Sequence, residues 1–186
     1  MLKLNPITPL GAATARVDRF SSLLITENPD RALVSLSARV DASEATRQKA
    51  KEFLDVDLPK PGRSISGPTY SAFWIGPESW MIDAPYEGNE DLARHLKTVF
   101  GDSASVVEQT DGWCRFDLAG VSQIAVLERL CNADCGQMDV GAVTRTQIHH
   151  LGCFLLHHQE GFRVICPRSS AGSLHHALMQ AAQSVC

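Results

Sequence analysis

Apolar and polar side chains alternate along residues 31–40, where the chain reads RALVSLSARV. In an extended backbone Leu33, Ser35 and Ser37 share one face, and the residues between them share the other. A period of two predicts a half-buried strand. Beyond Asp41 the apolar residues recur at helical spacing as far as Leu54, so a helix is expected to follow the strand.

Residues 57–69, DLPKPGRSISGPT, are rich in Pro, Gly and Ser and predict a loop. Residues 72–83 then read AFWIGPESWMID, in which two short apolar stretches flank Gly76-Pro77-Glu78-Ser79. Proline at the second position of a turn fixes φ, so this segment predicts a β-hairpin. An apolar stripe from Leu92 to Phe100, ended by Gly101, predicts the next helix.

The second half repeats this order of elements. Residues 105–118, SVVEQTDGWCRFDL, are consistent with two strands on either side of Asp111-Gly112 or with one bulged strand. A helix with apolar positions from Val121 to Cys131 is expected next. Three further strands and a last helix are predicted from TRTQIHH (144–150), CFLLHHQ (153–159), FRVIC (162–166) and the stripe from Leu174 to Ala181.

Both halves therefore read strand, helix, hairpin, helix, which predicts the α+β class with two side-by-side ferredoxin-like units. We expect the first unit to span residues 31–101 and the second residues 102–186. Residues 1–30 carry prolines at positions 6, 9 and 29 without a clear period, so they are predicted to form an extended N-terminal arm.

Composition and charge narrow the classes of function. The chain has 186 residues, of which 44% are hydrophobic and 20% charged, as in ordinary globular proteins. Its formal charge of −4 leaves little field to attract a polyphosphate, so no nucleic-acid partner is expected. No apolar run approaches the roughly 20 residues that cross a bilayer, and six cysteines are too sparse for a disulfide framework. We expect a cytoplasmic protein with reduced thiols and no membrane partner.

Six of the seven histidines form adjacent pairs, at 149/150, 157/158 and 175/176. One imidazole from each of two neighbouring strands could meet Cys153 or Cys166 in a zinc site. The alternative is that the pairs divide between the surface and the sheet edge, because no CxxC or helical HxxxH motif accompanies them. We assign the chain no metal site.

Two further candidates have structural alternatives. Cys131 and Cys135 form a C-x3-C that could hold a metal if two more ligands converged, or could simply be buried thiols that fill gaps. Asp111 in QTDGW could act as a general base, although an Asp-Gly pair is more often a turn. The chain has no P-loop, GxGxxG or nucleophile elbow, so we assign it no catalytic or cofactor-binding residue.

The aromatic hairpin remains the most informative feature. Burying one tryptophan removes on the order of 200 Å² from water and is worth roughly 5 kcal/mol. We therefore expect at least one of Trp74 and Trp80 in the core. The other, with Phe73, is predicted to contribute to a subunit interface, where tryptophan is enriched.

Four segments together resemble the gamma subunit of heterotetrameric sarcosine oxidase. They are AFWIGPESWMI (72–82), DLAG (117–120), TRTQI (144–148) and FRVICPRS (162–169), and the resemblance extends over roughly residues 31–183. The resemblance implies a fold similar to the folate-binding fold of aminomethyltransferases.

The resemblance also implies a role within a larger oxidoreductase of sarcosine catabolism and one-carbon metabolism. Such complexes convert sarcosine, tetrahydrofolate and O2 into glycine, 5,10-methylenetetrahydrofolate and H2O2. They carry FAD, FMN and NAD, which are expected on other subunits, so the expected partners are the alpha, beta and delta subunits. The gamma chain itself is implied to be a non-catalytic subunit for assembly and stability. The alternative is a stand-alone folate-binding or aminomethyltransferase-like module.

Overall fold

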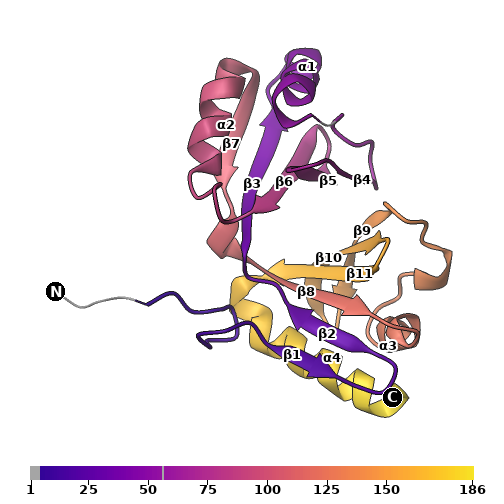
Figure 1. The fold of residues 1–186 in the computed structure, drawn as a ribbon. Helices are drawn as coiled ribbons and strands as arrows, with labels where there is room; N and C mark the ends of the chain where they lie inside the picture. Colours follow the sequence, from indigo (N-terminus) through magenta and orange to yellow (C-terminus); the bar gives the residue numbers. More distant parts are fainter. Residues whose placement is uncertain (1–4, 56) are drawn as a thin grey trace. The chain divides into compact units, whose positions relative to one another are not determined.

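The computed structural model describes residues 5–55 and 57–186, which fold into two units built on one antiparallel sheet each (Figure 1). The central unit comprises residues 30–110. The split unit combines residues 5–29 with residues 111–186. The predicted α+β class is confirmed. No helix among the described residues is long and apolar enough to span a membrane.

The central unit has a five-stranded sheet in the order β4-β5-β6-β3-β7. The predicted hairpin is present as β5 and β6, which pair from Ser71 opposite Asp83 to Gly76 opposite Ser79. The predicted loop at 57–69 contains one short strand, β4. The elements are β3 (Arg31–Ala38), α1 (Ser43–Leu54), β4 (Ser64–Ser66), β5 (Ser71–Gly76), β6 (Ser79–Pro85), α2 (Leu92–Phe100) and β7 (Ala104–Glu108).

The split unit has a six-stranded sheet in the order β1-β2-β8-β11-β10-β9. Its elements are β1 (Val17–Arg19), β2 (Leu24–Glu27), β8 (Trp113–Ala119), α3 (Gln123–Glu128), β9 (Val143–Ile148), β10 (Leu151–His158), β11 (Gly161–Pro167) and α4 (Ala171–Val185). Short 3₁₀ turns lie at Gly101–Ser103, Thr110–Gly112, Cys135–Gln137 and Arg168–Ser170.

The two sheets share one spatial arrangement of strands. In the central unit, β3, α1, β5, β6, α2 and β7 follow the ferredoxin-like order, and their strands lie in the sequence β5-β6-β3-β7. In the split unit the corresponding strands lie in the sequence β10-β11-β8-β2. The outer strands β4 and β9 occupy equivalent places beside the hairpins. The predicted strand-helix-hairpin-helix order is thus present in both units, and a fourth strand completes each.

That fourth strand accounts for two differences from the predicted boundaries. β7 pairs with β3, so the central unit extends to residue 110 rather than ending at 101. The N-terminal segment, expected as an extended arm over residues 1–30, supplies β1 and β2, and β2 pairs with β8. Residues 1–4 of the expected arm lie outside the described residues. Periodicity did not reveal β2, because a four-residue strand carries too little pattern to stand out.

Gly120 allows β2 to reach its place beside β8. Its φ is +126°, and a Cβ built there would lie 2.4 Å from the carbonyl oxygen of Ser22. Only glycine tolerates both that backbone conformation and that approach. Next to it, the Ser22 and Ser122 hydroxyls lie 2.6 Å apart, which fastens the start of β2 to the residue before α3.

Each unit has its own apolar core. In the central unit, Trp80 packs among aliphatic residues of β3 and β6 and the apolar faces of α1 and α2. In the split unit, the core-facing positions of β8 are Cys114, Phe116 and Leu118. That core also contains Cys135, Cys153 and Cys166, so buried thiols are a distinctive part of its packing.

Candidate functional site

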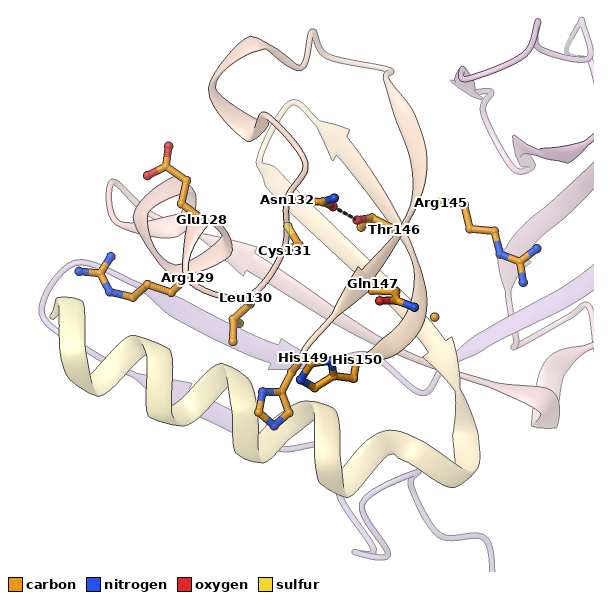
Figure 2. Close-up of a pocket in the computed structure, with 11 residues that line it drawn as sticks. Glu128, Arg129, Leu130, Cys131, Asn132, Arg145, Thr146, Gln147, His149 and His150 are labelled. Atoms are coloured by element: carbon orange, nitrogen blue, oxygen red, sulfur yellow. Dashed lines mark hydrogen bonds between the residues drawn. The ribbon is translucent and has the colours of Figure 1, made fainter.

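A hollow of about 810 Å³ lies in the split unit, between the end of α3 and the edge strand β9. Three segments form it: the residues after α3, strand β9, and the turn into β10. Figure 2 shows the lining side chains, which come from the end of α3, the loop after it and the β9–β10 hairpin. The lining residues are Glu128, Arg129, Leu130, Cys131, Asn132, Arg145, Thr146, Gln147, His149, His150 and Gly152.

The hairpin that joins β9 to β10 turns on His149 and His150. Ile148 pairs with Leu151, so the loop has only two residues, and both have positive φ, 47° and 70°. These values are those of a type I′ turn, the type that fits the twist of paired strands. Histidine tolerates positive φ better than most residues, although at a cost. Both imidazoles are exposed at the tip (Figure 2).

Hydrogen bonds hold the loop after α3 against this hairpin. The backbone N–H of His149 donates to the carbonyl oxygen of Leu130 at 3.0 Å. The hydroxyl of Thr146 donates to the side-chain oxygen of Asn132 at 3.2 Å, drawn as a dashed line in Figure 2. Cys131 lies between these two contacts in the sequence, so its position relative to the hairpin is fixed from both sides.

Cys131 is the one cysteine in the lining. Its side chain is half-buried, and its sulfur lies 3.3 Å from the carbonyl oxygen of Leu127 in the last turn of α3. The neighbouring thiol of Cys135 is buried. A hydrogen bond from Cys135 lowers the pKa of Cys131 to about 6, against the opposing effect of burial and with help from the backbone of Ala133. The pKa of Cys135 is raised by the same contact and by burial.

The remaining lining is mostly polar and includes two guanidinium groups. Arg129 donates to the carbonyl oxygen of Ala125 at 2.8 Å, which satisfies the end of α3. Arg145 lies over the ring of Phe154, 5.7 Å from its centre. Chemically the hollow combines hydrogen-bond donors with one sulfur nucleophile of lowered pKa.

The paired histidines do not form the hypothesised zinc site. His157 bonds through Nδ1 to the carbonyl oxygen of Met138 at 2.6 Å and stacks on Phe162, while His175 bonds to Asp18 at 2.7 Å. Cys153 and Cys166 lie in the core. Within residues 5–55 and 57–186, no three His, Cys, Asp or Glu side chains gather as metal ligands.

His158 is a different case. Burial lowers its pKa, and the nearby positive charge of Arg163 lowers it further. Its Nδ1 faces the backbone N–H of Glu160 at 3.4 Å. His158 therefore favours the neutral form, and its place on β10 is structural rather than at the hollow.

The other sequence candidates also have structural positions. Asp111 lies in the 3₁₀ turn Thr110–Gly112, as the turn interpretation predicted, and its carboxylate is 93% exposed and 3.7 Å from Arg168. It lines a second hollow of about 600 Å³ with Ile7 and Thr8. The thiols of Cys114 and Cys166, which lie in the core of the split unit, are 3.4 Å apart on paired strands.

The aromatic residues of the β5–β6 hairpin lie partly in the core and partly at half-buried positions. Trp80 is 1% exposed, its indole N–H donates to the carbonyl oxygen of Pro59 at 2.8 Å, and the guanidinium of Arg47 lies 4.8 Å from its ring centre. The prediction of at least one core tryptophan is confirmed. Phe73 is 2% exposed, and Trp74 is half-buried against the core. The predicted interface role of Phe73, Trp74 and Trp80 stays a prediction.

A charged cluster that sequence reasoning missed lies on the face of the split sheet opposite its core. Arg115 donates to Asp117 at 2.7 and 2.9 Å, Arg163 donates to the same carboxylate at 3.1 Å, and Asn28 donates at 3.2 Å. Burial opposes ionisation of Asp117, but the hydrogen bonds and charges of the arginines outweigh it and lower its pKa to about 2. The sequence contained one indication of this cluster: Arg115 and Asp117 are two residues apart, which places them on the same face of a strand.

Comparison with known proteins supports the fold rather than a family. No protein-family model matches the chain, and no curated protein matches it. Among solved structures, this chain has a fold like that of the aminomethyltransferases. Aminomethyltransferase T of the glycine cleavage system from Bartonella henselae superposes on it with a TM-score of 0.68 and 16% identity. The match covers 98% of this chain and 62% of that chain.

The particular similarity is to heterotetrameric sarcosine oxidase from Corynebacterium sp. U-96, solved with pyrrole 2-carboxylate. Its TM-score is 0.77 at 19% identity, over 88% of this chain and 85% of that chain. At the level of the fold, the expected relation to sarcosine oxidase and to the aminomethyltransferases is confirmed.

Proposed function

We propose that this chain is the gamma subunit of a heterotetrameric sarcosine oxidase and that it acts in assembly and stability rather than in catalysis. The observation that carries the proposal is the match in both fold and extent to a chain of that enzyme, with a TM-score of 0.77 and coverage of 88% and 85%. Fold alone does not determine function. The match covers most of both chains, however, and this favours an equivalent subunit.

In this proposal the redox chemistry belongs to the partners. The alpha, beta and delta subunits would carry FAD, FMN and NAD and use tetrahydrofolate, and the complex would work in the cytoplasm. This chain would supply a folded surface to them. Of the three aromatic residues predicted at the interface, Trp74 alone is more than marginally exposed, so we place the contact there.

The test is assembly. Co-expression with alpha, beta and delta subunits, followed by affinity purification on another subunit and sizing, should recover this chain in equal amount with them. Recovery of a full alpha-beta-delta complex that leaves this chain behind would contradict the proposal. The isolated chain, given sarcosine, tetrahydrofolate and O2, should form no H2O2, and sustained H2O2 production would contradict the non-catalytic role.

A matched pair of variants locates the contact. Trp74→Ala should weaken co-purification by about tenfold or more, because interface tryptophans carry much of the binding energy. Tyr86→Ala is the control, since Tyr86 is also in the central unit and is 45% exposed. Circular dichroism of both variants separates loss of binding from loss of folding. Equal recovery of the two variants would exclude Trp74 as a contact.

The second candidate is a stand-alone folate-binding module, favoured by the 0.68 TM-score with aminomethyltransferase T. The chain spans only 62% of that enzyme, so any shared activity would have to lie in the shared part. Calorimetric titration of the isolated chain with tetrahydrofolate distinguishes the candidates. Saturable binding without a partner supports the module, and its absence together with assembly supports the subunit.

A further inference from the structure

Strand β9 forms one edge of the split sheet. It stands last in the order β1-β2-β8-β11-β10-β9, so within the described residues it pairs with β10 alone. The side chains of Arg145 and Gln147 are exposed on it. Both residues line the 810 Å³ hollow together with the loop after α3 and with Gly152 of β10. The hollow therefore gives access to the outer edge of the sheet.

The register of the β9–β10 hairpin determines which backbone groups reach that edge. In a two-residue hairpin of type I′ the residues beside the turn, here Ile148 and Leu151, exchange hydrogen bonds, and bonded and non-bonded pairs alternate from there. Thr146 therefore bonds to β10, whereas the N–H and C=O groups of Arg145 and Gln147 point outward. In the part of the chain that the structure describes, these outward groups have no backbone partner.

One backbone hydrogen bond already uses this edge. The N–H of His149, the next outward group after Gln147, donates to the carbonyl oxygen of Leu130 at 3.0 Å. Two residues further on, Asn132 meets β9 through its side chain, which accepts from the hydroxyl of Thr146 at 3.2 Å (Figure 2). The loop after α3 thus bonds to the end of this edge and leaves the outward groups further along β9 to another strand.

We propose that the edge of β9 binds an extended segment of another protein, which adds a seventh strand to the split sheet and carries an acidic side chain opposite Arg145. When a strand is added to a sheet edge, the main chain supplies the hydrogen bonds and alternate side chains supply the selectivity. The outward groups of Arg145 and Gln147 supply the bonds on this side. The inference does not depend on the proposed subunit role.

Charge favours an acidic segment. The lining of the hollow contains two guanidinium groups, Arg129 and Arg145, against one carboxylate, Glu128, although the chain as a whole has a formal charge of −4. Side chains directly opposite on neighbouring strands have Cβ atoms about 5 Å apart. An acidic residue opposite Arg145 therefore gains a cross-strand ion pair, and a basic residue in that place is repelled.

The same charge disfavours a second copy of this chain as the added strand. In an antiparallel pair of two β9 strands, the register that uses every outward residue from Val143 to Gln147 is centred on Arg145. Each Arg145 then lies directly opposite its own copy. Like charges in that position are destabilising, and charged side chains on edge strands are a common protection against self-pairing. An acidic segment avoids this repulsion.

The experiment titrates the full chain with the synthetic peptide acetyl-Thr-Glu-Thr-Glu-Thr-Glu-Thr-amide, whose glutamates share one face of a strand. The control peptide has Lys in place of each Glu. Calorimetry should show saturable binding of the Glu peptide and binding of the Lys peptide that is weaker by about tenfold or more. Equal affinity for the two peptides, or no binding of either, would overturn the proposal.

Amide hydrogen exchange followed by NMR locates the bound peptide. Binding should slow exchange at Arg145 and Gln147, whose N–H groups point outward. It should change exchange little at Thr144 and Thr146, because these N–H groups already bond to β10. This alternation is specific to an added strand. Slower exchange that spares Arg145 and Gln147 would exclude the edge of β9 as the binding site.

A matched pair of variants tests the backbone contact. Gln147→Pro removes one outward N–H without removing a bond to β10, and proline is tolerated at such positions of edge strands. It should weaken binding of the Glu peptide by about tenfold, whereas Gln147→Ala keeps the N–H and should bind within about twofold of wild type. Equal binding by the two variants would refute the backbone contact. If Gln147→Pro fails to fold by circular dichroism, the exchange pattern of the wild type decides.

Two other occupants are outcomes of the same test. Self-association of the peptide-free chain, with slower exchange at Arg145 as its concentration rises, would identify a second copy as the partner. Tighter binding of a decathymidine oligonucleotide than of the Glu peptide would identify a nucleic acid instead. Either result would overturn the proposal. Arg145→Glu should reverse the preference between the Glu and Lys peptides, and an unchanged preference would show that Arg145 does not select the partner.

Discussion

The two units share a strand order but differ in what their cores contain. All six cysteines lie in the split unit, whereas two of the three tryptophans lie in the central unit. The central core is organised around Trp80, and the split core around aromatic residues interspersed with thiols. One strand arrangement therefore supports two kinds of interior, one centred on a tryptophan and one that contains several buried thiols.

The largest expected effect tests the central core. Trp80→Ala should destabilise the protein by about 3–5 kcal/mol, because it leaves a cavity and removes the bond to Pro59. Trp74→Ala should cost clearly less, since Trp74 is only half-buried. Urea denaturation followed by circular dichroism measures both. Equal losses for the two variants would show that the core is not centred on Trp80.

The next effect tests the split unit through Asp117. Asp117→Ala should cost about 3 kcal/mol, because two largely buried guanidinium groups lose a shared partner. The lowered pKa of Asp117, about 2 against an ordinary 3.8, means that its contribution is complete above pH 4. That contribution, on the order of 2 kcal/mol, should be lost as the pH falls from about 4 to 2.

Denaturation of wild type and Asp117→Asn across this pH range provides the check. The difference between the two proteins should shrink on acidification, since the wild-type carboxyl becomes protonated. A difference that stays constant from pH 5 to pH 2 would exclude the ionised carboxylate as its source.

A smaller effect concerns the N-terminal strands. Asp18 in β1 accepts from His175 in α4 at 2.7 Å and pairs with Arg16 at 3.1 Å, and both Asp18 and His175 are largely buried. Burial opposes ionisation, but His175 and Arg16 lower the pKa of Asp18 on balance. Its stabilising effect is thus present above the ordinary value of 3.8 and lost below it.

Asp18→Asn should cost about 1 kcal/mol and should act locally. Hydrogen exchange should speed up in β1 and β2 more than in β10 and β11. Asp102→Asn, at an exposed ion pair with Arg39, is the control and should change little. Exchange that rises equally throughout the split sheet would mean that the pair does not specifically fasten β1.

The smallest effect should be stabilising. Asn-Gly is the preferred pair for a type I′ turn, so the double substitution His149→Asn with His150→Gly should add about 0.5–1 kcal/mol. His176→Asn, at an exposed position of α4, serves as the control. A lower urea midpoint in the turn variant would show that contacts of the two imidazoles stabilise the protein by more than the strained backbone of the turn destabilises it.

Local pattern predicted those elements whose signal is local. The alternation of Ala32, Val34 and Leu36 identified β3 and its buried face, and the Gly-Pro turn identified the β5–β6 hairpin. The pairing of β2 with β8 could not be predicted in this way, because paired residues such as Leu24 and Ala119 are far apart in the sequence. Strands that pair across a long stretch of sequence leave no periodic pattern. The boundaries of the two units depend on the pairing of β2 with β8, so periodicity could not locate them.

The same limit applied to the candidate site. Cys131 and the paired histidines were recognised by residue type. In the structure His149 and His150 line the hollow together with Cys131, whereas His157 and His175 bond to other parts of the split unit. Adjacent histidines suggest a metal site only if their side chains converge. At 149/150 the pair instead forms a turn, which depends on the positive φ of both residues and is invisible in composition.

The N-terminal origin of β2 has a consequence for synthesis on the ribosome. The central unit contains all of its own strands within residues 30–110, so it can close as soon as its chain has emerged. β2 emerges earlier and can pair with β1, but its other neighbour, β8, is made only after the central unit. Nascent chains stalled when residues up to about 110 have left the ribosome should therefore carry one finished unit and a β1–β2 pair that still lacks the rest of its sheet.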